Sequence, residues 1–262
     1  PPQGDIALGN VVGSNIFNVA LILGAAALMR PIVIHSQIIK RELPILLLAS
    51  AVFILMIWDG EISRVDGGVL TAGIIAYVIF SLVSAKSAKK PSQFAEFEKE
   101  EIDHAKEKGA KRVLINVGLI LLGLVGLAYG ADRLVMSGIE LARLFEVPEA
   151  IIALTFFAFG TSVPELATSV VASLRNQGDI ITGNVVGSCI FNLLAVTGIV
   201  ALVGPLSAQD LQQEDVWVMG GLAVLLMPFM WYKLRLGRCE GGVLLAICLG
   251  YVGYLGVRGD VF

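Results

Sequence analysis

The chain has 262 residues, of which 56% are hydrophobic and 16% charged, and its formal net charge is −3 at pH 7. Soluble domains average about 25% charged residues and are rarely so apolar. The composition therefore excludes a soluble enzyme, a nucleic-acid-binding protein and a secreted disulfide scaffold. The three cysteines lie in or beside apolar runs without paired or metal-type spacing, and we interpret them as small apolar residues.

Eight apolar runs of 16 or more residues follow one another along the chain. They lie near residues 6–29, 43–58, 67–85, 113–145, 148–174, 180–203, 216–232 and 241–257. Because about 20 apolar residues cross a hydrocarbon core, they predict an all-α, polytopic membrane protein with eight transmembrane helices. The run 113–145 is too long for a perpendicular crossing and is expected to tilt, with its charged residues in the headgroup region or facing protein.

One long polar stretch separates the third apolar run from the fourth. Its mixed charges predict a solvated, partly helical linker at 86–111, between a first half at 1–85 with three helices and a second half at 112–262 with five. Threading the eight crossings puts fifteen Lys and Arg residues on the linker's side and three on the other. The positive-inside rule then predicts a cytoplasmic linker and an external C-terminus. We expect His35 and His104 to be isolated side chains.

A fifteen-residue element occurs twice at a constant offset of 174. Residues 4–18 read GDIALGNVVGSNIFN and residues 178–192 read GDIITGNVVGSCIFN, with twelve identical positions. The copies fall in the first and sixth crossings, so they are expected to run in opposite directions. Inverted repeats are typical of secondary transporters, whose substrate site lies near the membrane midplane between the repeats. The second copy is longer upstream, so we expect the first repeat to be incomplete here, with eight of ten crossings.

Glu165 lies at the centre of an otherwise uncharged crossing, where an ionisable group is costly unless it faces a cavity or a partner. The GTSVP sequence before it is expected to break the helix, because proline removes a backbone donor, and to turn carbonyls around Ala158 and Phe159 into a cavity. With the hydroxyls of Thr161 and Ser162, these oxygens suit Na⁺ or Ca²⁺. The alternative is a kinked helix with a protonated, hydrogen-bonded Glu165.

Each copy of the repeated element adds a pair of polar side chains four residues apart, on one helix face. These pairs are Ser14 with Asn18 and Ser188 with Asn192, and we predict that they complete the cation site. The alternative role for them is interhelical hydrogen bonding.

Other residues of the element are expected to be structural. We favour such bonding for Asn10 and Asn184. The G-x-x-x-G spacing of Gly9 with Gly13, and of Gly183 with Gly187, predicts close helix packing. Asp179 is expected to be a loop or cap residue at the end of its crossing.

FGTSVPE at 159–165, together with the two repeated elements, resembles the α-repeats of the sodium/calcium exchanger family. The resemblance implies ten helices in two inverted halves, with cation sites between them. Compared position by position, it implies that the cations are bound by Glu165, Thr161, Ser162, Ser188, Asn192, Ser14, Asn18 and the carbonyl of Ala158. Some relatives, including potassium-dependent ones, carry Asp where this chain has Asn192, which weakens the case for K⁺ cotransport. The GTS-x-PE element of the first repeat is absent from this sequence.

The predicted function is secondary active antiport of Na⁺ and Ca²⁺ by alternating access, without enzymatic activity or a cofactor. The expected partners are the two transported ions and the lipid bilayer, with no nucleic acid and no obligatory protein partner. The expected location is a prokaryotic inner (plasma) membrane. Proton/Ca²⁺ antiport is the alternative within transport. A cation channel or a non-transporting membrane scaffold is the alternative from another class, which the inverted duplication disfavours.

Overall fold

The computed structural model describes residues 3–87, 93–145, 149–209 and 211–258, and their side chains within 7–84, 113–145, 159–209, 211–232 and 234–257. The chain divides into two compact units, Pro1–Ile74 with Val135–Phe262, and Ile75–Leu134. All the side chains of the candidate site lie in the first, larger unit.

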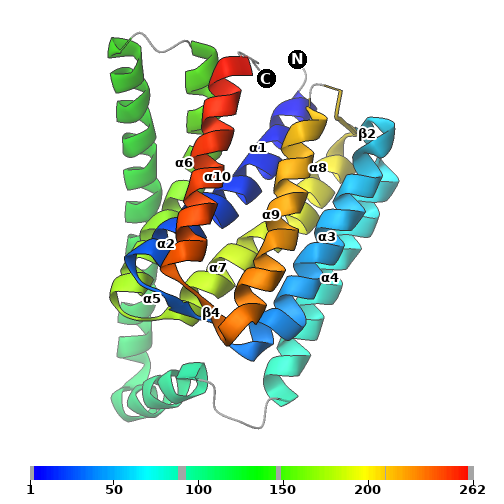
Figure 1. Cartoon of the computed structure of the whole chain (residues 1–262). Helices are drawn as coiled ribbons and strands as arrows, with labels where there is room; N and C mark the ends of the chain where they lie inside the picture. Colours follow the sequence, from blue (N-terminus) through cyan, green and yellow to red (C-terminus); the bar gives the residue numbers. More distant parts are fainter. Residues whose placement is uncertain (1–2, 88–92, 146–148, 210, 259–262) are drawn as a thin grey trace. The chain divides into compact units, whose positions relative to one another are not determined.

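The described residues are mostly helical (Figure 1). The first half comprises α1 (Gln3–Phe17), η1 (Asn18–Leu23), α2 (Gly24–Met29), β1 (Ile32–Val33), η2 (Ile38–Glu42), α3 (Leu43–Met56), η3 (Ile57–Asp59), β2 (Glu61–Ile62) and α4 (Arg64–Ser87). The second comprises α5 (Gln93–Leu144), α6 (Glu149–Leu174), α7 (Gly178–Phe191), η4 (Asn192–Val196), α8 (Thr197–Val203), β3 (Leu206–Ser207), α9 (Gln213–Trp231), η5 (Tyr232–Leu234), β4 (Arg235–Leu236) and α10 (Arg238–Arg258).

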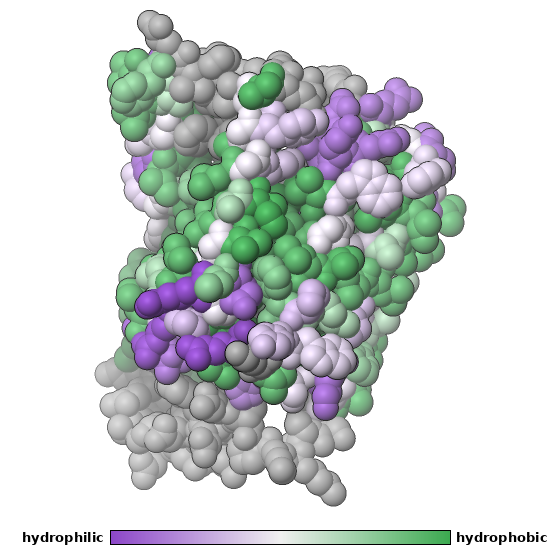
Figure 2. Space-filling model, viewed as in Figure 1, coloured by the Kyte–Doolittle hydropathy of each residue, from purple (hydrophilic) through white to green (hydrophobic). Residues whose placement is uncertain are grey.

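Helices long and apolar enough to cross a membrane account for seven of the eight predicted runs within the described residues. The remaining run, 148–174, coincides with α6, a helix of 26 residues. At about 1.5 Å per residue such a helix is also long enough to span a bilayer. Figure 2 shows a broad apolar surface over α9 and α10, with polar side chains gathered toward its ends. The polytopic, all-α membrane fold is therefore confirmed.

The smaller unit contains the end of α4 and most of α5. The predicted helical part of the linker begins at Gln93, where α5 starts, and α5 continues without interruption into the apolar run. Within α5 the Arg133 Nε lies 3.6 Å from the Asp132 carboxylate, and the Arg133 guanidinium lies 5.3 Å from the centre of the Tyr129 ring.

The larger unit is an inverted repeat that extends well beyond the fifteen-residue element. The offset of 174 residues carries α1, η1 and α2 onto α7, η4 and α8, and it carries β1, α3 and β2 onto β3, α9 and β4. In Figure 1, α1 and α7 cross the unit in opposite directions. The predicted antiparallel arrangement of the two copies is confirmed.

Two short β-ribbons each pair a strand of one repeat with a strand of the other. β1 pairs with β4, with Ile32 opposite Leu236, and β2 pairs with β3, with Ile62 opposite Leu206. Both pairs are antiparallel, and each contains one strand from each repeat. The β2 and β4 labels stand at opposite ends of the helices in Figure 1, so one ribbon lies at each end of the larger unit.

Glycines allow helices of the two repeats to touch at two equivalent places. A Cβ on Gly241 would lie 2.8 Å from the Gly24 carbonyl, and a Cβ on Gly67 would lie 2.9 Å from the Gly198 carbonyl. By contrast, a Cβ on Gly183 or on Gly187 would meet no atom of the described residues within 4 Å. The close packing predicted for these two was wrong, because the spacing marks a face of a helix without specifying what lies against it.

The centre of the larger unit is the helix that carries the first repeated element. Every residue from Val11 to Ala20 is buried, around the whole circumference of the helix, as expected of a helix surrounded by others. The backbone changes from α to π hydrogen bonding at Asn18, where η1 begins, and again at the equivalent Asn192, where η4 begins. Short π segments are rare and often occur at functional sites. The sequence did not predict them.

Candidate functional site

α6 provides the acidic side chain of the site. Its residues Thr161, Glu165 and Thr168 lie on one face, because residues three and four apart in a helix are neighbours. The predicted helix break before Glu165 was wrong, since α6 continues through Pro164. Proline at 164 removes one helical donor, the partner of the Gly160 carbonyl, and a single missing bond leaves a helix continuous.

Ala158, whose carbonyl was a predicted ligand, lies in α6 one turn before Ser162. The Ala158 side chain is outside the described set. The carbonyl that loses its helical donor to proline is that of Gly160, four residues before Pro164. The sequence-based expectation therefore named neighbouring carbonyls, around Ala158 and Phe159, rather than the one directly affected.

One end of this face contacts α1. The hydroxyls of Ser14 and Thr161 lie 2.7 Å apart, and the Thr161 hydroxyl also donates to the Asn10 side-chain oxygen at 3.4 Å. The rings of Phe17 and Phe159 pack edge to face, with centroids 6.4 Å apart. A serine of the first repeated element is thus placed directly against a hydroxyl of the α6 motif.

The other end of the same face contacts α7. The Thr168 hydroxyl donates to the Glu165 carbonyl at 2.9 Å and accepts from the Asn184 amide at 3.2 Å. Asn184 therefore joins helices, as Asn10 does. Glu165 lies between Thr161 and Thr168, so it faces the place where α1 and α7 meet α6.

Several oxygens in this region have no hydrogen-bond partner among the described residues. They are Glu165 Oε2, Ser162 Oγ and Ser169 Oγ on successive turns of α6, and Asn18 Oδ1 at the start of η1, and all four atoms are buried. The segment η1 packs against α6. Nearly all buried polar atoms in proteins are hydrogen-bonded, so the four unpartnered oxygens in this region are candidates for contact with a ligand.

The second repeated element reaches this region through amide contacts. The Asn192 amide donates to Asn15 Oδ1 at 3.1 Å, and the Asn15 amide donates to the Cys189 carbonyl at 3.4 Å. Ser188 is half-buried on α7, one turn before Asn192. Asn15 and Ser169 were missed in the sequence. The available signals were the polar position inside the repeated element for Asn15 and the spacing of four from Glu165 for Ser169.

Residues 2–83 and 115–257 match the protein family described as sodium/calcium exchanger protein. This chain belongs to the sodium/calcium exchanger family. The exchanger is 34% identical to the putative antiporter CaxA of Alkalimonas amylolytica, over 94% of this chain and 77% of that protein. It is 33% identical to the inner membrane protein YrbG of Escherichia coli K12, over 88% of this chain and 70% of that protein.

The fold of this exchanger is similar to that of a solved relative. Over 95% of this chain and 77% of the other, the structure superposes on the sodium–calcium exchanger NCX_Mj soaked with Na⁺ and Sr²⁺, with a TM-score of 0.77 and 28% sequence identity. The resemblance inferred from the α-repeats is therefore confirmed, and the chain is an exchanger-type cation transporter.

The site chemistry of the exchanger is that of hard oxygen donors. The carboxylate of Glu165 lies on a helix face with hydroxyl and amide oxygens, and the described part of the chain holds no group of three or more His, Cys, Asp or Glu side chains placed to share a metal. Such a set suits Na⁺ and Ca²⁺ better than zinc or copper, which favour nitrogen and sulfur ligands.

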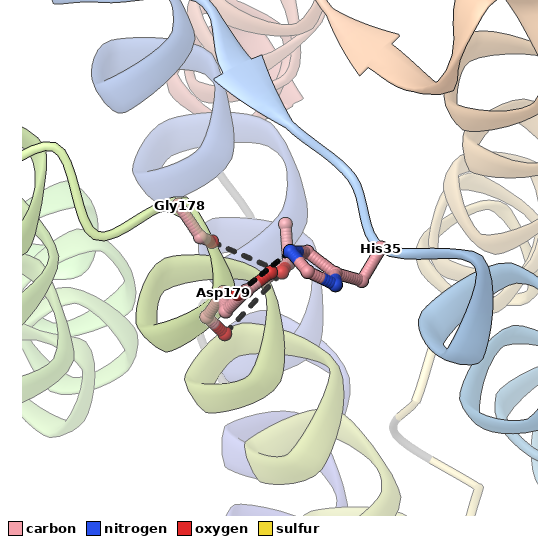
Figure 3. Close-up of polar contacts among 4 residues, drawn as sticks. His35, Gly178 and Asp179 are labelled. Atoms are coloured by element: carbon pink, nitrogen blue, oxygen red, sulfur yellow. Dashed lines mark hydrogen bonds and ion pairs between the residues drawn. The ribbon is translucent and has the colours of Figure 1, made fainter. Parts of the chain in front are cut away.

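A second polar contact lies at the beginning of α7, at one end of the exchanger. His35 Nε2 is 3.0 Å from an Asp179 carboxylate oxygen (Figure 3), and the Thr182 hydroxyl donates to the Gly178 carbonyl at 3.1 Å. The expectation that His35 is isolated was wrong, because the inverted fold brings together residues far apart in the sequence. His104 lies outside the described side chains.

Proposed function

We propose that this exchanger couples Na⁺ entry to Ca²⁺ export, and that both ions bind beside Glu165. The observation that carries the proposal is the buried carboxylate oxygen of Glu165, which has no hydrogen-bond partner among the described residues. The same is true of the Ser162 hydroxyl one turn earlier in α6 and of Asn18 Oδ1 in η1, a segment that contacts α6. A charged group in a membrane-spanning helix is stable only with a partner or a polar cavity. A bound cation supplies both the missing charge and the missing contacts.

The remaining predicted ligands extend the same oxygen set. Ser14 and Thr161 contribute adjoining hydroxyls at the α1–α6 contact, and Ser188 and Asn192 contribute from α7 and η4. The Ala158 carbonyl is the backbone ligand that the family resemblance implies. One set of anionic and neutral oxygens holds either Ca²⁺ or Na⁺, because both loads together would crowd like charges in a medium of low dielectric constant. Mutual exclusion at one site is the basis of antiport.

We further propose that the end of the larger unit with the β1·β4 ribbon faces the cytoplasm. Arg30 stands just before β1, Arg235 is part of β4 and Arg238 begins α10. Among the described residues, Arg64 is the one basic residue close in sequence to a strand of the opposite ribbon. This asymmetry supports a prokaryotic plasma-membrane orientation with the linker 86–111 inside and the C-terminus outside.

Proton coupling is the competing function, and the same observation supports it. A buried carboxylate without a partner can bind a proton as well as Na⁺ when Ca²⁺ leaves. The two functions differ in the gradient that drives Ca²⁺ movement, not in the residues that bind Ca²⁺.

The deciding experiment measures Ca²⁺ uptake into proteoliposomes that contain the purified exchanger. Vesicles loaded with Na⁺ and diluted into Na⁺-free medium at equal pH are expected to accumulate ⁴⁵Ca²⁺. Vesicles with only a pH gradient, in choline medium, are expected to match protein-free vesicles. Uptake driven by the pH gradient alone would replace Na⁺ with H⁺ as the coupling ion, and uptake in neither condition would refute exchange.

A further inference from the structure

Asn15 and Cys189 occupy equivalent positions of the two repeats and contact each other. The Asn15 amide nitrogen lies 3.4 Å from the Cys189 carbonyl oxygen, and the Cys189 thiol lies 4.0 Å from the Asn15 carbonyl oxygen. Both residues are almost fully buried, with 3% and 1% of their surface exposed. Since each position is the image of the other under the offset of 174, this contact lies where the two repeats meet.

The surroundings of Asn15 fix which way its amide points. Its Nδ2 atom faces the Cys189 carbonyl and, at 3.8 Å, the Met219 sulfur, and both of these groups can only accept. A reversed amide would place its oxygen against two acceptors in a buried position. Leaving buried polar groups unsatisfied in this way costs about 1–3 kcal/mol each, so the side-chain oxygen of Asn15 points away from Cys189.

That orientation in turn fixes the amide of Asn192. Asn15 Oδ1 accepts a hydrogen bond from Asn192 Nδ2 at 3.1 Å. With the nitrogen of Asn192 directed at Asn15, the side-chain oxygen is the end of the Asn192 amide left to contact a cation. A reversed Asn192 would oppose two amide oxygens and would direct its NH₂ group, which carries partial positive charge, to the other side.

We propose that Asn15 is a positioning residue, which holds the Asn192 amide with its oxygen directed toward the transported cation. This inference rests on the proposed function and deepens it. The fixed orientation begins at a backbone carbonyl, which no substitution at residue 189 removes. Cysteine at 189 also places no second amide opposite Asn15, so no competing side chain disturbs the orientation.

A double-mutant cycle tests the proposal. Asn15→Leu, which is similar in size but cannot bond, is combined with Asn192→Ser, which keeps an oxygen but has no amide to orient. The Ca²⁺ concentration at half-maximal uptake is measured for the four proteins in Na⁺-loaded proteoliposomes. We expect Asn15→Leu alone to raise it about tenfold, and to raise it less than about twofold in the Asn192→Ser background, since coupled residues show non-additive effects.

Two further variants keep the result interpretable. Thr182→Val replaces another buried polar side chain of the larger unit, in the first turns of α7, whose hydroxyl donates to backbone carbonyls of its own helix, and it reports the general effect of such a change. Asn15→Ser takes the place of Asn15→Leu if the latter does not elute as a single species on gel filtration. Its short hydroxyl cannot span both Cys189 and Asn192, so the same rise is expected.

The outcomes distinguish failure of the positioning role from failure of the proposed Na⁺/Ca²⁺ exchange. If the unaltered exchanger takes up Ca²⁺ against Na⁺ but Asn15→Leu has the same effect in both backgrounds, Asn15 is merely structural and the positioning role is overturned. If the unaltered protein shows no Na⁺-driven uptake, and Ca²⁺ does not raise its unfolding temperature, the proposed function itself fails. A rise confined to the background with Asn192 supports the positioning role.

Discussion

The hydroxyl oxygen of Ser14 lies 2.7 Å from that of Thr161, so a hydrogen bond joins α1 of the first repeat to α6 of the second. Ser14 is buried, and a bond in this position also ties the repeated element to the helix that carries Glu165. The two motifs that the sequence singled out separately therefore meet in space at this pair, beside the Asn10–Thr161 and Phe17–Phe159 contacts.

Loss of this hydrogen bond is expected to weaken cation binding. Thr161→Val keeps the shape of the side chain but leaves Ser14 without its hydroxyl partner, and a typical buried hydrogen bond contributes about 0.5–1.5 kcal/mol. We predict a rise of about 3- to 10-fold in the Ca²⁺ concentration for half-maximal uptake. Ser50→Ala, at a buried serine of α3, is the control and should change this concentration less than about twofold. Equal effects of the two substitutions would contradict the prediction.

Glu165→Gln is expected to abolish Na⁺-driven Ca²⁺ uptake while the protein remains folded. The substitution keeps the size of the side chain and removes the only negative charge proposed for the described part of the site, so a divalent cation loses its main electrostatic partner. Uptake by reconstituted protein is the measurement, with gel filtration as the check on folding. Glu61→Gln, an exposed acid in β2, is the matched control and should transport normally. Transport retained by Glu165→Gln would remove Glu165 from the site.

The glycine contact between Gly24 and Gly241 offers a sharp test of the packing between repeats. Gly241→Ala would place a Cβ 2.8 Å from the Gly24 carbonyl and 2.9 Å from the Ala27 Cβ. Such overpacking typically costs about 1–3 kcal/mol, so the unfolding temperature in detergent should fall by several degrees. The neighbouring Gly242→Ala adds a Cβ that meets no described atom within 4 Å. It should leave the unfolding temperature unchanged or slightly higher, because alanine favours helix. A fall for both variants would argue against the contact.

The contact of His35 with Asp179, which is an ion pair when His35 is protonated, is expected to contribute only modestly to stability. The two side chains are 44% and 22% exposed, and partly exposed pairs are worth about 1 kcal/mol or less because solvent and salt screen them. Asp179→Asn should therefore lower the unfolding temperature slightly at low ionic strength, and the difference should vanish in about 1 M NaCl. A larger loss that persists at high salt would show that Asp179 acts through packing or helix capping instead.

Much of this fold was predictable because it follows from patterns along the chain. Apolar runs located the crossings, the copies at 4–18 and 178–192 fixed the inversion, and an acid amid apolar neighbours marked Glu165. The pairing of His35 with Asp179 was not predictable, because it joins a loop of one repeat to a helix start of the other. The orientation of Asn15 depends on a backbone carbonyl that no sequence pattern reveals. At Gly183 the prediction failed in the other direction. The G-x-x-x-G spacing predicted a closely packed neighbouring helix, but no described atom lies within 4 Å of a Cβ built on this residue.

The pairing of β1 with β4 and of β2 with β3 has a mechanical consequence. Each repeat pairs a strand with the other at both ends of the larger unit, so the backbone ties the two repeats together on either side of the α1 and α7 core. Under the proposed function, we therefore expect access to the site to change through movement of elements outside this paired core, while the core itself keeps its arrangement.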